Sequence, residues 1–336
     1  MQTVKIKTSD TIIWNRDQVY ADIAVAMAND QPLTLDLLGE GPCWHSLAIE
    51  PDIIGLASQF NYDLNKVIVL TSNAVKTESQ LHFQFTGMQH LVDLSKVNFP
   101  PQNKVSNIVP FGMFVGRSNA PRLWLASYLE EHYSSKSILT YHLNQQVEFH
   151  RDNIGLEDLY QTFGIKNIAQ CAKFIETCPR LLPGNDVVQI DSNSQHNPAN
   201  QFMKADQTQL VDQYPKFLVE IVGETYYTGQ TFFVTEKTWR PILLKTPFIV
   251  QGPQWFLRNL KKLGFMTFDQ WWDEGYSEDP PTHQIVEIAR VIDYLACKTP
   301  QQLQAMYEEM RDILEYNYVI FESLIASDFS GLYGRI

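Results

Sequence analysis

The sequence lacks the cysteine patterns that bind zinc or form redox pairs. Its four cysteines include no Cys-x-x-Cys pair and no cysteine–histidine cluster with zinc spacing. No apolar run approaches the length needed to cross a bilayer, and the first residues lack the apolar core of a secretory signal. These absences favour a cytoplasmic protein with reduced thiols and no transmembrane segment.

Positive charge is also scarce. The chain has 26 Lys and Arg against 38 Asp and Glu, which gives a formal net charge of −12. An acidic chain repels the phosphate backbone of nucleic acid, so nucleic acid is an unfavoured partner. The aspartates Asp93 and Asp191 do not form an Asp-x-Asp metal signature, and none stands elsewhere. The sequence therefore predicts no metal site and leaves the oligomeric state open.

What the sequence does contain is a globular α/β pattern. With 336 residues, 44% of them hydrophobic and 19% charged, the chain is long enough for one large or two medium domains. Apolar β-branched runs alternate with segments of helical spacing. The expected strands are Leu33–Leu38, Lys66–Thr71, Gln89–Leu94, Ile108–Val115, Ser137–His142, Phe217–Val222 and Pro247–Val250. The expected helices are Pro51–Phe60, Pro121–His132, Leu156–Phe163, Ile168–Thr177, Glu236–Leu244 and Pro253–Leu263, with a mainly helical tail over Pro280–Phe329.

The polar, proline-containing stretch Asn98–Asn107 is the expected linker between two blocks of this pattern. Strand, helix and strand in succession predict parallel pairing through right-handed crossovers. The sequence thus predicts two Rossmann-like domains with a cleft between them, residues 1–104 and 105–290. A helical segment, 291–336, is expected to pack back on them.

The clearest chemical motif is Thr235-Glu236-Lys237 at the start of an expected helix. Thr235 suits the N-cap, and the next two residues then lie beside free backbone N–H groups at the positive end of the helix dipole. That place favours a phosphate, with Lys237 as a mobile cation and Glu236 as a partner for ribose hydroxyls. The same pattern also occurs as ordinary helix capping.

The longer string 232–252 resembles the donor-binding segment of the α-1,3-fucosyltransferase-like glycosyltransferases, including bacterial and phage-type relatives. That segment has Thr-Glu-Lys, a helix and a buried Pro-(Ile/Val)-(Ile/Val) strand, although here Phe248 intervenes after the proline. Gly264–Phe268 and Asp273–Tyr276 look like further elements of related sequences. The resemblance, strongest over 217–278, implies a GT-B-like fold and contacts from Glu236 and Lys237 to the donor nucleotide, with a GDP-sugar favoured.

Two upstream segments resemble the same family. Residues 114–122 are similar to the element that opens its donor domain, which implies that Arg122, or else Arg117, neutralises a diphosphate and that Asn119 lies beside them. Alternatively, Arg122 is an ordinary residue in the first turn of a helix, without a role in binding. Leu38–Pro42 looks like the acceptor-side loop that holds the family's catalytic base, which implies this role for Glu40. Gly41 stands where the family has Asn.

Three further residues are candidates without a motif of their own. Glu224 and Tyr227 precede the Thr-Glu-Lys loop, and are expected either near the donor base or sugar or as supports for the loop. His45 follows the Glu40 loop and either shares the acceptor site or is structural.

Together these features predict a metal-independent, inverting glycosyltransferase that moves a sugar from a nucleotide-sugar to a hydroxyl acceptor, such as a glycan. No cofactor beyond the donor is expected. Two alternatives stay open: a non-catalytic binding or structural protein on a degenerated glycosyltransferase scaffold, and a phage-type DNA-base glycosyltransferase.

Overall fold

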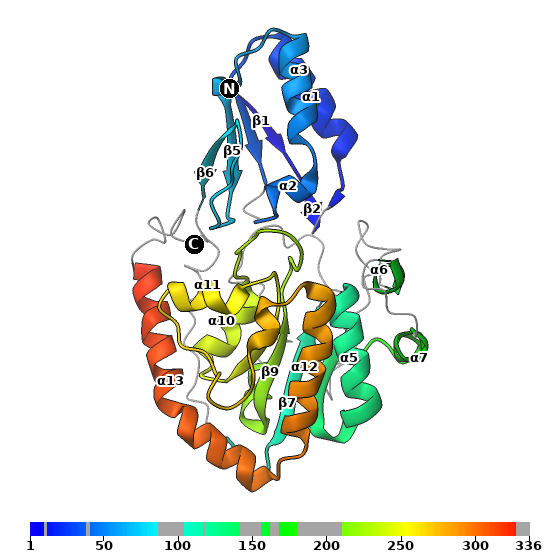
Figure 1. Cartoon of the computed structure of the whole chain (residues 1–336), viewed down its shortest axis with the longest axis vertical. Helices are drawn as coiled ribbons and strands as arrows, with labels where there is room; N and C mark the ends of the chain where they lie inside the picture. Colours follow the sequence, from blue (N-terminus) through cyan, green and yellow to red (C-terminus); the bar gives the residue numbers. More distant parts are fainter. Residues whose placement is uncertain are drawn as a thin grey trace. The chain divides into compact units, whose positions relative to one another are not determined.

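The computed structural model describes residues 1–9, 12–37, 41–86, 104–116, 118–141, 156–161, 168–180 and 210–326. Within them the chain forms two α/β units, each built on a four-stranded parallel sheet (Figure 1). Unit 1 comprises Met1–Gln89, Thr225–Phe233 and Leu324–Ile336, and unit 2 comprises His90–Glu224 and Val234–Ser323. The predicted α/β class, with two parallel sheets and a helical C-terminal region, is confirmed.

Unit 1 adds its strands in sequence order. Its elements are β1 (Gln2–Lys5), β2 (Thr8–Ser9), β3 (Ile12–Ile13), α1 (Arg16–Ala28), β4 (Leu33–Asp36), α2 (Trp44–Leu47), α3 (Glu50–Gln59), η1 (Leu64–Lys66), β5 (Val67–Thr71) and β6 (His82–Phe85). The sheet order is β1-β4-β5-β6, and β2 and β3 form a separate antiparallel ribbon. Because every crossover steps in the same direction, this sheet has no point where the strand order reverses among its described strands.

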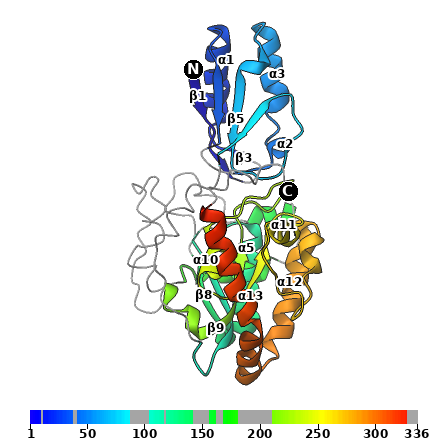
Figure 2. The same cartoon turned by 90° about the vertical axis from the view of Figure 1, so that its left-hand side faces the viewer.

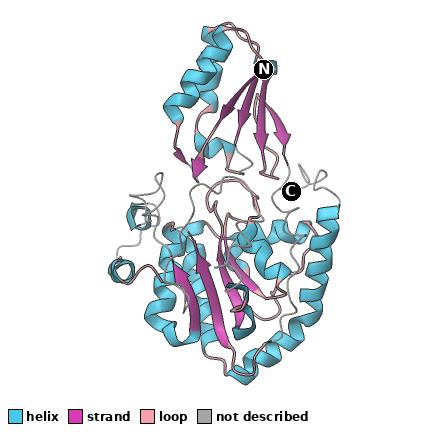
Figure 3. Cartoon of the chain, turned by 180° about the vertical axis from the view of Figure 1, so that it is seen from behind, coloured by secondary structure: helices cyan, strands magenta, loops and turns pink. Residues whose placement is uncertain are grey.

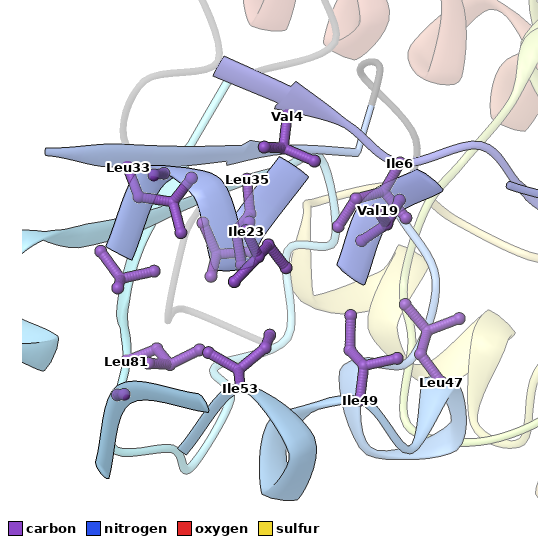
Figure 4. Packing of buried hydrophobic residues seen from close by; sticks show 14 of the residues in the cluster. Val4, Ile6, Val19, Ile23, Leu33, Leu35, Leu47, Ile49, Ile53 and Leu81 are labelled. Carbon is purple, nitrogen blue, oxygen red and sulfur yellow. The ribbon is translucent and has the colours of Figure 1, made fainter. Parts of the chain in front are cut away.

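The core of unit 1 lies between this sheet and two helices. Helices α1 and α3 pack side by side (Figure 2). Figure 4 shows Ile23 of α1 and Ile53 of α3 with Leu35 of β4, and all three side chains are fully buried. Along β5, Val67 and Val69 are buried while Ile68 is half-buried, the alternation of a pleated strand.

The segment Thr225–Phe233 completes unit 1 although it is distant in sequence. The buried Asn73 side chain holds it: Nδ2 donates to the carbonyl oxygen of Gln230 at 3.1 Å, and Oδ1 accepts from the backbone N–H of Phe232 at 2.9 Å. Gly229, with φ +70°, lies so close to Cys43 that an added Cβ would be 2.6 Å from the Cβ of that residue. This close approach and the positive φ both require glycine.

Unit 2 contains the longer elements. They are β7 (Val109–Val115), α5 (Ala120–Tyr133), η3 (Ser134–Lys136), β8 (Ser137–Tyr141), α6 (Leu156–Gln161), α7 (Ala169–Glu176), η5 (Tyr214–Lys216), β9 (Phe217–Gly223), α10 (Glu236–Leu243), β10 (Phe248–Gln251), α11 (Phe256–Lys262), η6 (Gly275–Glu278), α12 (Pro281–Ala296) and α13 (Pro300–Ala326). None of the helices in the described part of the chain is long and apolar enough to cross a membrane.

The strand order of unit 2 reverses at its centre. The order is β10-β9-β7-β8, with all neighbours parallel (Figure 3). From β7 the chain steps to β8 through α5, whereas from β9 it steps the other way to β10 through α10. The two helices lie on opposite faces, because Phe111 of β7 meets Tyr133 of α5 while Phe114, three residues on, lies under Arg240 of α10.

Most predicted elements agree with these bounds. The elements before Leu33 (β1, β2, β3 and α1), the short helix α2 and strand β6 were not predicted. The expected strand Gln89–Leu94 lies outside the described residues, as does most of the expected linker 98–107. The helix expected from Pro253 begins at Phe256. The expected tail is two helices, since α12 ends at Ala296 and Pro300 begins α13, the place where proline is best tolerated.

Candidate anion-binding site

A pocket lies in unit 2 where the strand order reverses. Its walls are the carboxyl ends of β7 and β9, with Arg122 from α5 on one face and Lys237 and Arg240 from α10 on the other. The space left between these side chains is small, about that of one water molecule. In parallel α/β sheets, ligands bind at this kind of reversal, outside the carboxyl ends of the strands.

Helix α5 begins at the pocket and places Arg122 there. The Asn119 side chain caps the helix by accepting from the N–H of Arg122 at 3.0 Å. Arg122 is buried, and its Nε donates to the carbonyl oxygen of Gly223 at 2.9 Å. A Cβ at Gly223 would lie 2.6 Å from Cγ of Arg122, so the glycine makes room for the arginine.

Helix α10 begins at the same edge of the sheet, on the opposite face. Thr235 is its N-cap, and Oγ1 accepts from the N–H of Lys237 at 3.3 Å. Behind it, the fully buried Glu224 accepts from the hydroxyls of Thr235 and Thr238, at 2.5 Å each, and from the N–H of Thr235 at 3.2 Å. The carboxylate therefore fixes the first turn of the helix.

Glu236 and Lys237 form an ion pair at this helix start. Their charged groups are 2.6 Å apart, and the side chains are 40% and 21% exposed. Desolvation alone would raise the pKa of the Glu236 carboxyl, but the Lys237 ammonium and the hydrogen bonds around it lower that pKa to about 2. Glu236 is therefore ionised at neutral pH.

A buried ion pair forms the inner end of the pocket. Arg240 donates from Nη2 to Oε1 of Glu220 and from Nε to the Tyr214 hydroxyl at 2.6 Å, and the Tyr214 hydroxyl donates to Oε2 of Glu220. Burial raises the pKa of Glu220 against the attraction of Arg240, and burial raises the pKa of Tyr214 as well. Lys104 lies behind the pair, where its Nζ donates to the Tyr214 carbonyl at 2.8 Å.

The pocket has an excess of positive charge, although two of its cations are paired, Lys237 with Glu236 and Arg240 with Glu220. Of its charged lining residues, three are cationic (Arg122, Lys237 and Arg240) and one is anionic (Glu220). The N-termini of two helices add partial positive charge from opposite faces of the sheet. Backbone N–H groups at helix starts and cationic side chains beside them are features that favour the binding of a phosphate group.

The predicted residues have different places in this structure. Arg122 and Lys237 line one pocket, Glu236 pairs with Lys237, Asn119 caps α5 and Glu224 supports α10. Their contacts with a donor stay predictions. The structure assigns Tyr227, which is buried, to unit 1, and it places His45 on the exposed side of α2 in that unit. Glu40 and Arg117 lie outside the described residues.

Sequence reasoning did not predict the inner end of the pocket. Glu220 is the one charged residue of the apolar strand Phe217–Val222, and a charge in a fully buried strand needs a partner. That signal was available in the sequence. Arg240 and Tyr214 carry no such signal, because only the folded chain brings them to Glu220. Among the described residues, no group of three or more His, Cys, Asp or Glu side chains has the arrangement of a metal site.

Comparisons with known proteins give a distant structural likeness. No protein-family model matches the sequence, and no curated protein gives a significant match. A solved structure described as trehalose-6-phosphate from E. coli bound with UDP-2-fluoro glucose aligns with 98% of this chain and 74% of its own, at 12% identity and a TM-score of 0.39. A likeness this distant supports no conclusion about function. The function proposed below is therefore argued from the residues of the pocket.

Proposed function

We propose that this chain is a glycosyltransferase that moves a sugar from a nucleotide-sugar to a hydroxyl acceptor. The observation that supports it most is the positive pocket at the strand reversal of unit 2, where the Thr235-Glu236-Lys237 helix start meets Arg122. The charge of the pocket suits a diphosphate, and the resemblance of 217–278 to fucosyltransferase-like donor segments supports a GDP-sugar donor.

The proposed reaction is a metal-independent displacement that inverts the anomeric carbon. The acceptor oxygen bonds to this carbon while the bond to the outer diphosphate oxygen breaks, and the electron pair leaves with the nucleoside diphosphate. Arg122 and Lys237 stabilise the charge that develops on the departing oxygens. This electrostatic preorganisation acts without any movement of solvent.

Two carboxylates have distinct roles in this proposal. Glu236, which is ionised and 40% exposed, accepts hydrogen bonds from the ribose hydroxyls while it holds Lys237 in position. The acceptor's proton passes to a general base, which the resemblance assigns to Glu40.

The test is a thermal-shift panel of GDP, UDP, CDP and ADP and their sugars, on the wild type and on Lys237→Ala. A ligand at one hundred times its Kd stabilises the folded state by about 2.7 kcal/mol. We expect one nucleotide to raise the Tm of the wild type and to have little effect on Lys237→Ala. Lys262→Ala, which removes an exposed lysine outside the pocket, is the matched control and keeps the shift.

Product analysis then separates the enzyme from a binding protein. Incubation of the selected nucleotide-sugar with a panel of glycans should release nucleoside diphosphate in proportion to a glycosylated product. Absence of any nucleotide shift, or full transfer activity in Lys237→Ala, contradicts the proposal. Selective binding without hydrolysis or transfer favours a binding protein on this scaffold.

A further inference from the structure

A second hollow lies on the surface of unit 2, between the end of α12 and the first turns of α13. The two helices diverge from the short connection 297–299 (Figure 1). The hollow has room of about 340 Å³, which falls within the roughly 300–1,000 Å³ of small-molecule sites. Its lining comes from both helices and from the preceding loop at Gln270 and Trp271.

This hollow is separate from the anion pocket. Lys136, which directly precedes β8, donates from Nζ to the carbonyl oxygen of Ala296 at 2.7 Å, so the end of α12 lies at the amino edge of the sheet. The anion pocket lies at the carboxyl edge. A strand of seven residues, such as β9, separates the two edges by roughly 20 Å.

Two aromatic side chains line the hollow, and each has a fixed neighbour. Trp271 is half-buried, and its indole N–H donates to Oε2 of Glu309 at 3.0 Å. Tyr294 is 46% exposed, and the ammonium group of Lys298 lies 4.0 Å from its ring centre. Because these contacts restrict both rings before any ligand arrives, packing a ligand against them costs little side-chain entropy.

The polar groups of the hollow are balanced in charge. Of the described residues that line it, Lys298 is the cation and Glu309 the anion. The exposed side-chain amides of Gln270 and Gln302 add neutral donors and acceptors. A neutral ligand with many hydroxyl groups therefore matches this lining better than a phosphate, which requires an excess of positive charge.

A sugar ring meets both requirements. Its C–H groups pack against an aromatic face, while its hydroxyls exchange hydrogen bonds with amide, carboxylate and ammonium groups. We propose that this hollow binds a short stretch of a neutral saccharide chain. The stretch stays partly hydrated, because the hollow is open to solvent. The inference goes beyond the proposed function, since this contact needs neither a nucleotide-sugar nor transfer.

The test titrates the full chain, labelled with 5-fluorotryptophan, with neutral hexasaccharides of glucose, mannose, galactose and N-acetylglucosamine. Fluorine NMR observes the seven tryptophans, and Trp271→Phe assigns the signal of Trp271. We expect a hexasaccharide of this panel to shift that signal and to bind with a Kd of about 1 mM or tighter. Guanosine and uridine, which stack through planar bases, are titrated in parallel.

Three variants locate the binding. Tyr294→Ala removes one aromatic face and should weaken the saccharide about fivefold or more. Tyr316→Ala is the matched control, because Tyr316 of α13 is 43% exposed and lies outside the hollow, and it should keep wild-type affinity. Gln302→Leu replaces an exposed amide with an apolar side chain, so it should weaken a saccharide and strengthen an apolar ligand.

The following outcomes overturn the inference. If no hexasaccharide shifts the Trp271 signal, the hollow is not a saccharide site. If a hexasaccharide binds Tyr294→Ala as tightly as the wild type, it binds elsewhere on the chain. A shift with guanosine or uridine but with no hexasaccharide assigns the hollow to a planar base. None of these outcomes affects the proposed function, which the nucleotide panel tests separately.

Discussion

Gly223 ends strand β9 directly beneath the Arg122 side chain, and its replacement tests how the pocket is built. A Cβ added there would lie 2.6 Å from Cγ, 3.1 Å from Nε and 3.3 Å from Cδ of Arg122. Cγ is close to the backbone and has little freedom to give way, so Gly223→Ala must drive Arg122 into another rotamer. This shift breaks the 2.9 Å hydrogen bond from Nε to the Gly223 carbonyl, so the buried guanidinium loses that acceptor.

The cost has two parts. A hydrogen bond from a charged donor contributes about 1.5–3 kcal/mol, and crowding a packed site costs typically about 1–3 kcal/mol. Because part of the crowding is relieved when Arg122 moves, we expect the free energy of unfolding to fall by about 2–4 kcal/mol. Nucleotide affinity should fall tenfold or more, since each factor of ten is about 1.4 kcal/mol of lost binding.

A double-mutant cycle measures whether Arg122 carries this effect. Urea unfolding and nucleotide titration are run on Gly223→Ala, on Arg122→Ala and on the double variant. We expect the double variant to bind no more weakly than Arg122→Ala alone, because both changes remove the same contact. Gly116→Ala is the control for stability, since a Cβ there meets no atom within 4 Å. Wild-type nucleotide affinity in Gly223→Ala, or fully additive losses, would refute the reasoning.

Two further predictions concern buried polar groups. Burial lowers the pKa of Lys104 from its usual 10.5 to about 7, so between these values the unfolded chain binds a proton that the folded chain does not. Urea unfolding from pH 6 to pH 10 should therefore show wild-type stability rising relative to Lys104→Met through this window, and a pH-independent difference contradicts the pKa. Asn73→Leu leaves the Gln230 carbonyl and the Phe232 N–H without their partner and should lower the free energy of unfolding by about 3 kcal/mol or more. Hydrogen exchange should rise in 225–233, and wild-type protection of that segment in a folded Asn73→Leu variant would contradict its role.

The strands that were predicted from sequence are those with continuous runs of apolar, mostly β-branched residues. Val67–Thr71 and Phe217–Gly223 read as strands because β-branched and apolar side chains fill both faces of a covered parallel sheet. Strand β6 was not predicted because His82–Phe85 is short and two of its four residues are polar, alternating exposed with half-buried side chains. Its strand state comes from pairing with β5, which is a tertiary interaction.

The candidate site divides in the same way. The Thr235 cap was predicted, because capping depends on neighbours in sequence, and it is confirmed by the hydrogen bond to the Lys237 N–H. Arg122 was left between two explanations, and the structure brings it to the pocket of Lys237. The Arg240–Glu220–Tyr214 cluster joins residues up to 26 positions apart, and no local pattern encodes that contact. Donor contacts of the predicted residues stay predictions.

The nine residues Thr225–Phe233 have a consequence for how the protein is made. They complete unit 1 through Asn73, yet they are synthesised only after all of the chain that separates them from residue 89. On the ribosome, the first 89 residues lack the hydrogen bonds from Asn73 to Gln230 and Phe232 until Phe233 emerges, although Asn73 also bonds Pro42 and Val75 within them. A fragment that stops at residue 89 lacks these two hydrogen bonds permanently. Unit 1 therefore begins at the N-terminus but is completed late in synthesis. It cannot be completed until more than a hundred residues of unit 2 have been synthesised.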